Sequence, residues 1–185
     1  ALALDYVSAA DFVVLDSGEL DFLVTPAGDP STALLEMVGL VEAGSEYTFL
    51  TGTSPDGMIG VLGPDDRRGV ATEARLRAIH AINTDEIINV YLSLELPTTM
   101  PPAYGDGIVR NIGYGTVSNL FAGEPGEYYL SITIRPELAG GGEANLVEPI
   151  VVQLNGADNL SILIAQASAA EQTPYQIILI DETLN

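Results

Sequence analysis

Short runs of alternating hydrophobic and polar residues recur along the chain, separated by clusters of glycine, proline, aspartate and asparagine. The clearest run is residues 128–134, where every second side chain is Tyr, Leu or Ile. Such period-two runs, with breakers between them, are typical of β-strands. The best helical candidate, Ser31–Val38 after an Asp-Pro pair, is short. The pattern therefore predicts an all-β fold.

Seven strands are expected in the second half of the chain, and this density is typical of an immunoglobulin-like β-sandwich. Their content of β-branched and aromatic residues supports the assignment. The predicted strands are residues 75–81, 88–94, 116–121, 128–135, 150–154, 160–167 and 176–180.

The chain also contains an internal repeat at an offset of 108 residues (114 − 6), with Tyr, Gly, Glu and Thr in register. When small gaps are allowed, residues 47–51 align with residues 160–164, and both copies end on an acidic pair. We therefore expect a tandem repeat. The aligned segments are Tyr6–Phe12 with Tyr114–Leu120, Asp16–Glu19 with Glu124–Glu127, Phe22–Thr25 with Leu130–Thr133, and Asp65-Asp66 with Asp181-Glu182.

The two copies are not equivalent, because residues 74–108 have no counterpart before Ala1. We expect two immunoglobulin-like antiparallel β-sandwich domains, the first lacking its opening strands. Residues 1–66 would form the incomplete sandwich, residues 67–73 a linker and residues 74–185 a complete sandwich. Missing strands would expose the interior and leave open sheet edges, which soluble monomers seldom tolerate.

Composition narrows the function classes. The chain has 185 residues, of which 47% are hydrophobic, so it can bury a core. No apolar run reaches the roughly 18 residues of a membrane span. There are 26 acidic residues and 6 basic ones, for a net charge of −20, which argues against a nucleic-acid partner. The acidity favours either solubility in salty water or binding of cations such as Ca²⁺.

Two residue types are missing. Cysteine is absent, which excludes disulfides, thiolate metal sites and thiol nucleophiles. Lysine is also absent, since all six basic residues are Arg, and this excludes isopeptide cross-links between Lys and Asn.

The segment Ala74–Ala81 carries an Arg-x-x-His-Ala pattern, and here the chain resembles the DUF4397 domain over residues 74–182. Further similar features are Asn89-Val-Tyr91, Ile112–Val117 and Gly123–Tyr128. The family usually has an acidic residue at the position of Asn89, and it lacks the proline-rich insertion at 96–103. The resemblance implies a β-sandwich of bacterial secreted or cell-surface proteins, often in tandem, with no established catalytic residues.

No catalytic, cofactor or metal site is predicted, and we do not expect an enzyme. His80 is the single histidine and shares a strand face with Leu76 and Ala78, so a structural role is favoured. No Gly-x-Ser-x-Gly elbow occurs. The acidic glycine-containing stretches lack calcium-loop spacing and are expected to be turns. An enzyme using two carboxylates is a weaker hypothesis, because a sequence does not fix their separation.

Two modification patterns occur. Thr98 and Thr99 lie in the proline-rich stretch 96–102 and are candidates for O-glycosylation in an exposed loop. Asn159-Leu-Ser161 fits the N-glycosylation pattern, but it lies in or at the edge of a predicted strand.

These features favour a structural subunit of an extracellular filament or surface assembly, a head-to-tail homopolymer joined by donor-strand complementation. The expected donor is the N-terminal segment, where Leu2, Leu4 and Tyr6 alternate, with Phe12 and Val14 extending the face. The alternative is a non-catalytic binding or spacer module, a fragment of a larger cell-surface protein.

Overall fold

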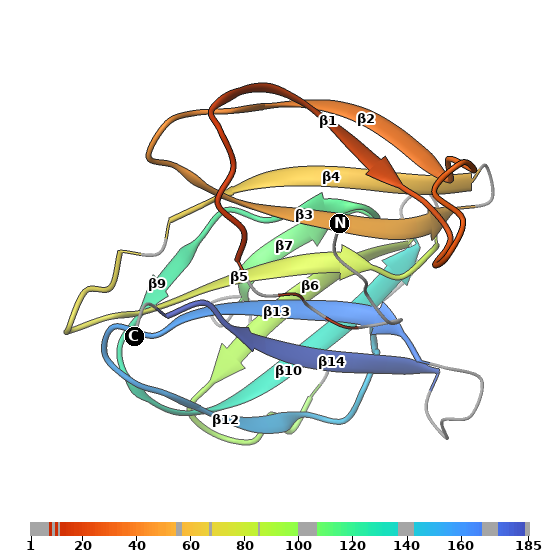
Figure 1. Cartoon of the computed structure of the whole chain (residues 1–185). Helices are drawn as coiled ribbons and strands as arrows, with labels where there is room; N and C mark the ends of the chain where they lie inside the picture. Colours follow the sequence, from red (N-terminus) through yellow and green to blue (C-terminus); the bar gives the residue numbers. More distant parts are fainter. Residues whose placement is uncertain are drawn as a thin grey trace. The chain divides into compact units, whose positions relative to one another are not determined.

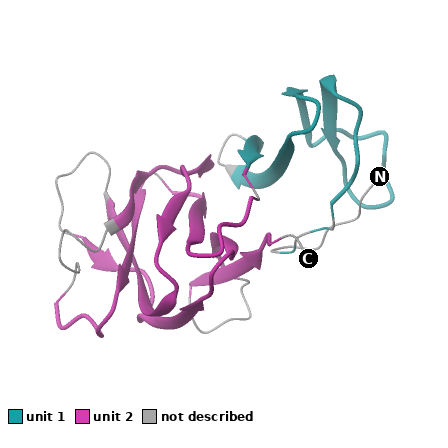
Figure 2. Ribbon diagram, turned by 90° about the vertical axis from the view of Figure 1, so that its left-hand side faces the viewer, with its two compact units in different colours: residues 1–65 teal, residues 66–185 magenta. Residues whose placement is uncertain are grey.

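The computed structural model describes residues 8, 10, 12–54, 57–66, 68–84, 86–99, 107–136, 143–167 and 174–183. These residues form fourteen strands and no helix (Figure 1), which confirms the all-β prediction. Among them there is no helix long and apolar enough to cross a membrane. The chain divides into two compact units, residues 1–65 and 66–185, coloured separately in Figure 2.

Unit 1 consists of two antiparallel hairpins. They pack through their inward side chains, since the ring centroids of Phe22 and Phe49 are 4.8 Å apart. Gly39 allows this approach, because a Cβ there would lie 2.7 Å from Cδ2 of Leu62. The first hairpin is β1 (Gly18–Val24) with β2 (Leu35–Val41), and the second is β3 (Glu46–Ser54) with β4 (Gly57–Asp65).

The best helical candidate, Ser31–Val38, forms no helix, because strand β2 begins at Leu35. The carboxylate of Asp29 accepts hydrogen bonds from the hydroxyls of Ser31 (2.6 Å) and Thr32 (2.7 Å) and from the Ser31 amide (3.1 Å). This is the local bonding that can cap a helix, but here it closes a turn between β1 and β2. Burial then alternates along β2, as in a strand with one covered face.

Unit 2 contains ten strands in two five-stranded sheets. One sheet has the order β11-β10-β6-β7, with β12 also paired to β10; the other has the order β14-β13-β5-β8, with β9 also paired to β5. The strands are β5 (Ala74–Ala81), β6 (Glu86–Ser93), β7 (Gly107–Ile112), β8 (Thr116–Val117), β9 (Phe121–Gly123), β10 (Gly126–Pro136), β11 (Ala144–Asn145), β12 (Ile150–Leu154), β13 (Asn159–Gln166) and β14 (Tyr175–Asp181).

Both sheets of unit 2 contribute to one hydrophobic core. Leu76 of β5 and Ile162 of β13 come from one sheet, and Val90 of β6 and Ile132 of β10 come from the other. Each of these side chains is at most 1% exposed. Because the inward faces of two sheets fill a single core, unit 2 has the layered arrangement of a β-sandwich. The immunoglobulin-like strand order stays a prediction.

Strands β5 and β13 form the one parallel pair among the described residues, from Asn159 opposite Arg75 to Ala165 opposite Ala81. The other pairs are antiparallel, as expected. Most antiparallel neighbours follow each other closely in the chain, whereas β5 and β13 are joined through many other strands. No tight turn fixes their relative direction, so the parallel arrangement is possible.

Residues 70–73, which fall within the expected linker, are bonded to the turn between β12 and β13. The amide of Ala157 is 3.0 Å from the carbonyl oxygen of Val70 and 2.8 Å from that of Glu73. Gly156 permits this contact, because a Cβ there would collide with the carbonyl oxygen of Ala71. The turn therefore attaches this segment to unit 2.

Candidate functional site

Each strand of unit 1 has a single strand neighbour among the described residues, β1 with β2 and β3 with β4. A strand with one neighbour presents backbone N–H and C=O groups along its other edge, where a further strand can add. Both hairpins therefore offer sites for β-augmentation.

The interior of unit 1 is only partly covered. Leu20, Phe22 and Val24 point inward along β1, yet all of them are half-buried. In unit 2, by contrast, Leu130 and Ile132 on the inward face of β10 are 0% exposed. By the repeat alignment these two residues correspond to Phe22 and Val24. The inward face of β1 thus retains apolar surface that a further strand could cover.

An apolar segment precedes β1. This segment belongs to no strand (Figure 1). Its four consecutive hydrophobic residues are exposed: Phe12 (58%), Val13 (52%), Val14 (99%) and Leu15 (55%). Four consecutive exposed hydrophobic residues of high β-propensity are unusual on a soluble surface and mark an interaction site or an aggregation hazard. Two of the predicted assembly residues, Phe12 and Val14, lie here. The other three, Leu2, Leu4 and Tyr6, fall outside the described residues.

The outer face of the β1–β2 hairpin is also apolar in part. Leu23, Val38 and Leu40 are 55%, 58% and 66% exposed, and they alternate with acidic side chains on the same face. In the register of the hairpin, Glu19 lies opposite Leu40 and Asp21 opposite Val38. The acidic residues limit non-specific association of this face.

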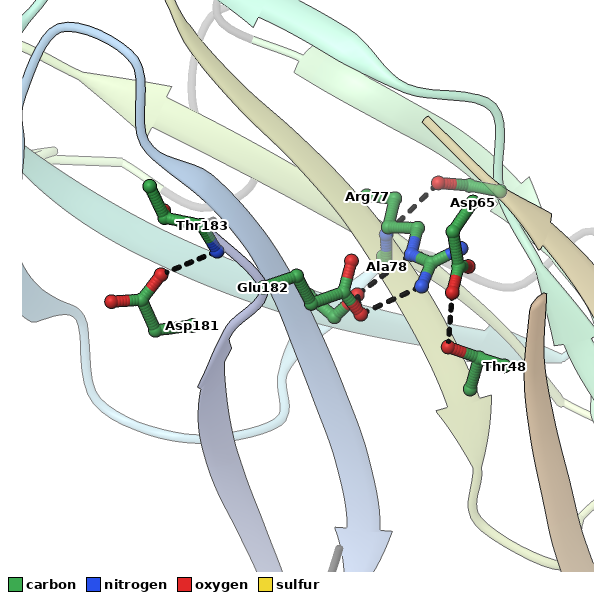
Figure 3. Close-up of polar contacts among 9 residues, drawn as sticks. Thr48, Asp65, Arg77, Ala78, Asp181, Glu182 and Thr183 are labelled. Carbon is green, nitrogen blue, oxygen red and sulfur yellow. Dashed lines mark hydrogen bonds and ion pairs between the residues drawn. The ribbon is translucent and has the colours of Figure 1, made fainter. Parts of the chain in front are cut away.

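Unit 2 carries a buried ion pair on the outward side of β5 (Figure 3). Nη2 of Arg77 lies 2.6 Å from Oε1 of Glu182, and the Ser161 hydroxyl donates to the same carboxylate oxygen at 2.6 Å. The Arg77 Nε also donates to the Ser161 oxygen at 2.7 Å. The three groups are hydrogen-bonded to one another, as is usual for a buried ion pair with a structural role.

A second polar cluster lies on the outward side of β6 and β10. Glu143 accepts hydrogen bonds at 2.7 Å from both the Tyr91 and the Thr133 hydroxyls. Burial, together with the nearby Glu143, raises the pKa of Tyr91 to about 12. The hydroxyl oxygen of Ser131, opposite Tyr91, is buried without a hydrogen-bond partner among the described residues. Because Ser131 is 0% exposed, it is not placed to act as a nucleophile.

His80 is fully buried, on the same face of β5 as Leu76 and Ala78, as the alternation predicted. Its Nδ1 accepts a hydrogen bond from the Ile82 amide at 3.2 Å, which leaves Nε2 to donate to the Glu86 carbonyl at 3.1 Å. Burial lowers the pKa of His80. This bonding describes a neutral imidazole that connects β5 to the start of β6.

The carboxylates of the predicted turns have protein partners. Asp65 accepts a hydrogen bond from the Thr48 hydroxyl at 2.9 Å. Asp66 binds Arg68 at 2.7 Å and Arg75 at 3.2 Å, and the hydrogen bond from Arg68 lowers the pKa of Asp66 below its usual range. Within the described residues, no group of three or more His, Asp or Glu is placed to hold a metal ion. Asp56 and Asp106 lie outside these residues.

The two candidate modification sites differ in exposure. Thr98 and Thr99 are exposed in a bend after β6, so their hydroxyls are accessible and O-glycosylation stays a prediction. Asn159, by contrast, is 1% exposed in β13. A glycan there is incompatible with the folded strand.

No known protein-family model matches the sequence. A search of curated proteins finds no match either. The candidate functional site is therefore defined by the geometry of unit 1 alone: two open hairpins and the exposed segment that leads into β1.

Sequence reasoning missed the two polar clusters of unit 2. Arg77 and Glu182 are 105 residues apart, and Tyr91 and Glu143 are 52 apart. Period-two alternation places the Arg77 side chain on the solvent face of its strand. This local pattern contains no information about a partner that is distant in the sequence. The single available signal was the opposite charge of Arg77 and Glu182.

Proposed function

We propose that this chain is a structural subunit of an extracellular filament or surface assembly. Subunits join head to tail, each donating a strand that completes the incomplete first sandwich of the next. The observation that supports this most directly is the half-buried inward face of β1, in a unit where every strand has a single strand neighbour among the described residues.

The strand pairing of the two units supports the proposal. The hairpin β1–β2 begins with Gly18 opposite Val41, and the pair β10–β12 begins with Gly126 opposite Leu154. Likewise, β3–β4 and β13–β14 are both antiparallel hairpins that end on an aspartate. In unit 2, however, β10 also pairs with β6, and β13 also pairs with β5. Neither neighbour has a counterpart among the described residues of unit 1.

The proposed donor is residues 1–7 of a neighbouring subunit. Leu2, Leu4 and Tyr6 alternate along it, as a strand with one buried face requires, and Asp5 is its single charged residue. Because the donating and accepting surfaces differ, the contact is head to tail, and such contacts propagate into filaments when they do not close into a ring. An extracellular, bacterial location and membership of the DUF4397 family belong to this proposal.

Deletion of residues 1–7 tests the proposal. We expect the deleted chain to keep its far-ultraviolet circular dichroism and to form no filaments by negative-stain electron microscopy. A matched pair of variants separates strand donation from a general loss of apolar residues. Leu2→Asp with Leu4→Asp should abolish filaments, whereas Ala1→Asp with Ala3→Asp, on the opposite strand face, should retain them. Filaments from the deleted chain would contradict the proposal.

The alternative is a non-catalytic binding or spacer module of a larger cell-surface protein. It is favoured by the same open hairpins if a preceding part of the parent protein supplies the strands. Intact-mass spectrometry of the native protein distinguishes the two functions. A mass close to 19.4 kDa, before any glycans, supports the self-assembling subunit, and a much larger polypeptide supports the spacer module.

A further inference from the structure

Strand β5 occupies a central place in unit 2. It pairs with β13 on one side and with the short strands β8 and β9 on the other. On the β9 side, Leu76 lies opposite Phe121, Arg75 opposite Ala122 and Ala74 opposite Gly123. Residues 121–123 therefore form a strand because they pair with β5. After β9 the chain crosses to the other sheet, where it forms β10.

The counterpart of β9 in unit 1 is Val13–Leu15, at the repeat offset of 108 residues (121 − 13). In both units two residues separate the end of this segment from the glycine that begins the next strand, Gly126 of β10 or Gly18 of β1. Val13–Leu15 belongs to no strand and is more than half exposed. The difference follows from the absence of a β5 counterpart among the described residues of unit 1.

We propose that Val13–Leu15 forms part of the acceptor and pairs with the strand that a neighbouring subunit donates. The donated strand lies between β3, to which it is parallel, and Val13–Leu15, to which it is antiparallel. This inference rests on the proposed function and refines it, because it moves Phe12 and Val14 from the donor face to the receiving subunit.

The register follows from β5. If Leu2, Leu4 and Tyr6 take the inward positions of Ala74, Leu76 and Ala78, then Leu15 lies opposite Leu2, Val14 opposite Ala3 and Val13 opposite Leu4. Phe121 packs against the core of unit 2, whereas Ala122 is exposed. By the same alternation, Val13 and Leu15 turn inward and meet leucines, and Val14 stays on the outer face.

The lack of cysteine makes disulfide trapping a clean test. Residues directly opposite in an antiparallel pair have Cβ atoms about 4.5–5.5 Å apart, which is close enough for a disulfide after small adjustments. Full-length Val14→Cys and Ala3→Cys are purified separately, mixed under assembly conditions and oxidised. We expect a cross-linked dimer on non-reducing gels from the mixture, in large excess over either variant alone.

Two controls keep the result specific. Val14→Cys mixed with Leu4→Cys places the thiols on opposite faces and should give little dimer. Val151 lies on β12 of unit 2 and is 57% exposed. The dimer formed when Val151→Cys is mixed with Ala3→Cys therefore measures cross-linking by random collision. A second arm uses a synthetic peptide of residues 1–7 with cysteine in place of Ala3, which should label full-length Val14→Cys but not Val151→Cys.

The outcomes separate the two proposals. If residues 1–7 are required for filaments but neither arm labels Val14→Cys above the Val151→Cys control, the acceptor role of Val13–Leu15 is overturned and strand donation survives. If filaments form without residues 1–7, strand donation itself fails. Equal cross-linking of Ala3→Cys and Leu4→Cys to Val14→Cys would contradict the proposed register.

Discussion

Arg77 and Glu182 form an ion pair with a separation of 2.6 Å between Nη2 and Oε1, although they are 105 residues apart in the chain. Arg77 belongs to the first strand of unit 2, and Glu182 follows its last strand directly. The pair therefore joins the two ends of this sandwich. Both side chains are shielded from solvent, at 2% and 9% exposure, so the pair is not weakened by water as a surface pair would be.

Removing one partner of this pair should destabilise unit 2 strongly. Arg77→Met leaves the Glu182 carboxylate buried with one fewer charge-compensating group, and we expect a loss of about 3–5 kcal/mol in the free energy of unfolding. Denaturant unfolding followed by circular dichroism measures it, since the chain has no tryptophan. The double variant Arg77→Met with Glu182→Leu should recover much of the loss. The control is Arg68→Met. Because the Arg68 side chain is 86% exposed, this variant should show no detectable change in the free energy of unfolding.

The pH dependence of stability should include a contribution from His80. Burial holds the pKa of His80 in the folded protein below the ordinary 6.5, so the unfolded chain takes up this proton first as the pH falls. The contribution of His80 to the free energy of unfolding is complete above the pKa that His80 has in the unfolded chain, and it is lost as the pH drops below that pKa. The unfolding free energy at pH 5.5 should therefore fall relative to pH 7.5. This difference should be smaller in His80→Gln, and an equal difference would show that another group is responsible.

Gly156 should not tolerate a side chain. Alanine there would place its Cβ against the carbonyl oxygen of Ala71, a backbone atom that cannot rotate away. We expect Gly156→Ala to lower the unfolding free energy by about 1–3 kcal/mol, the usual range for overpacking. Gly113→Ala is the matched control, because nothing lies within 4 Å of a Cβ at that position. Similar melting temperatures for the two variants would argue against a tight contact at this turn.

Salt should promote the proposed assembly. Subunits with a net charge of −20 repel one another, and the screening length shortens from about 30 Å at 0.01 M salt to about 10 Å at 0.1 M. The rate of filament growth, followed by light scattering and checked by electron microscopy, should therefore rise with NaCl concentration. Growth that becomes slower as salt is added would indicate that attraction between charges, and not strand insertion, drives association.

Hydrophobic alternation predicted most of the long strands of unit 2, because their inward faces line one core. The predicted segment 150–154 coincides with β12, and segments 128–135 and 160–167 lie close to β10 and β13. By contrast, β7 was missed. Its pairing with β6 contains irregularities, and Asn111 has a φ of 56°, so its alternation is broken. The segment 116–121 splits into β8 and β9.

The candidate site was predictable in part. Comparison of the two copies predicted that residues 74–108 have no counterpart in the first copy, and the described residues of unit 1 contain no counterpart of β5 or β6. It could not indicate that Val13–Leu15 is exposed, because these residues resemble any buried strand in composition. Likewise, Asp29 and Ser31 favour a helix start and a hairpin turn equally, and the pairing of β2 with β1 decided between them. Long-range pairing is the information that a local pattern lacks.

The parallel pairing of β5 with β13 also bears on when the sandwich can close. Arg77 and Ser161, which meet across these strands, are 84 residues apart, and contacts of such long range form slowly. During synthesis β5 therefore remains unpaired with β13 until that much later strand has been made. Under the proposed strand complementation, unit 1 stays similarly incomplete until another subunit donates its strand. Filament growth would then be the final folding step of unit 1, and its rate should show the curved temperature dependence of a folding reaction.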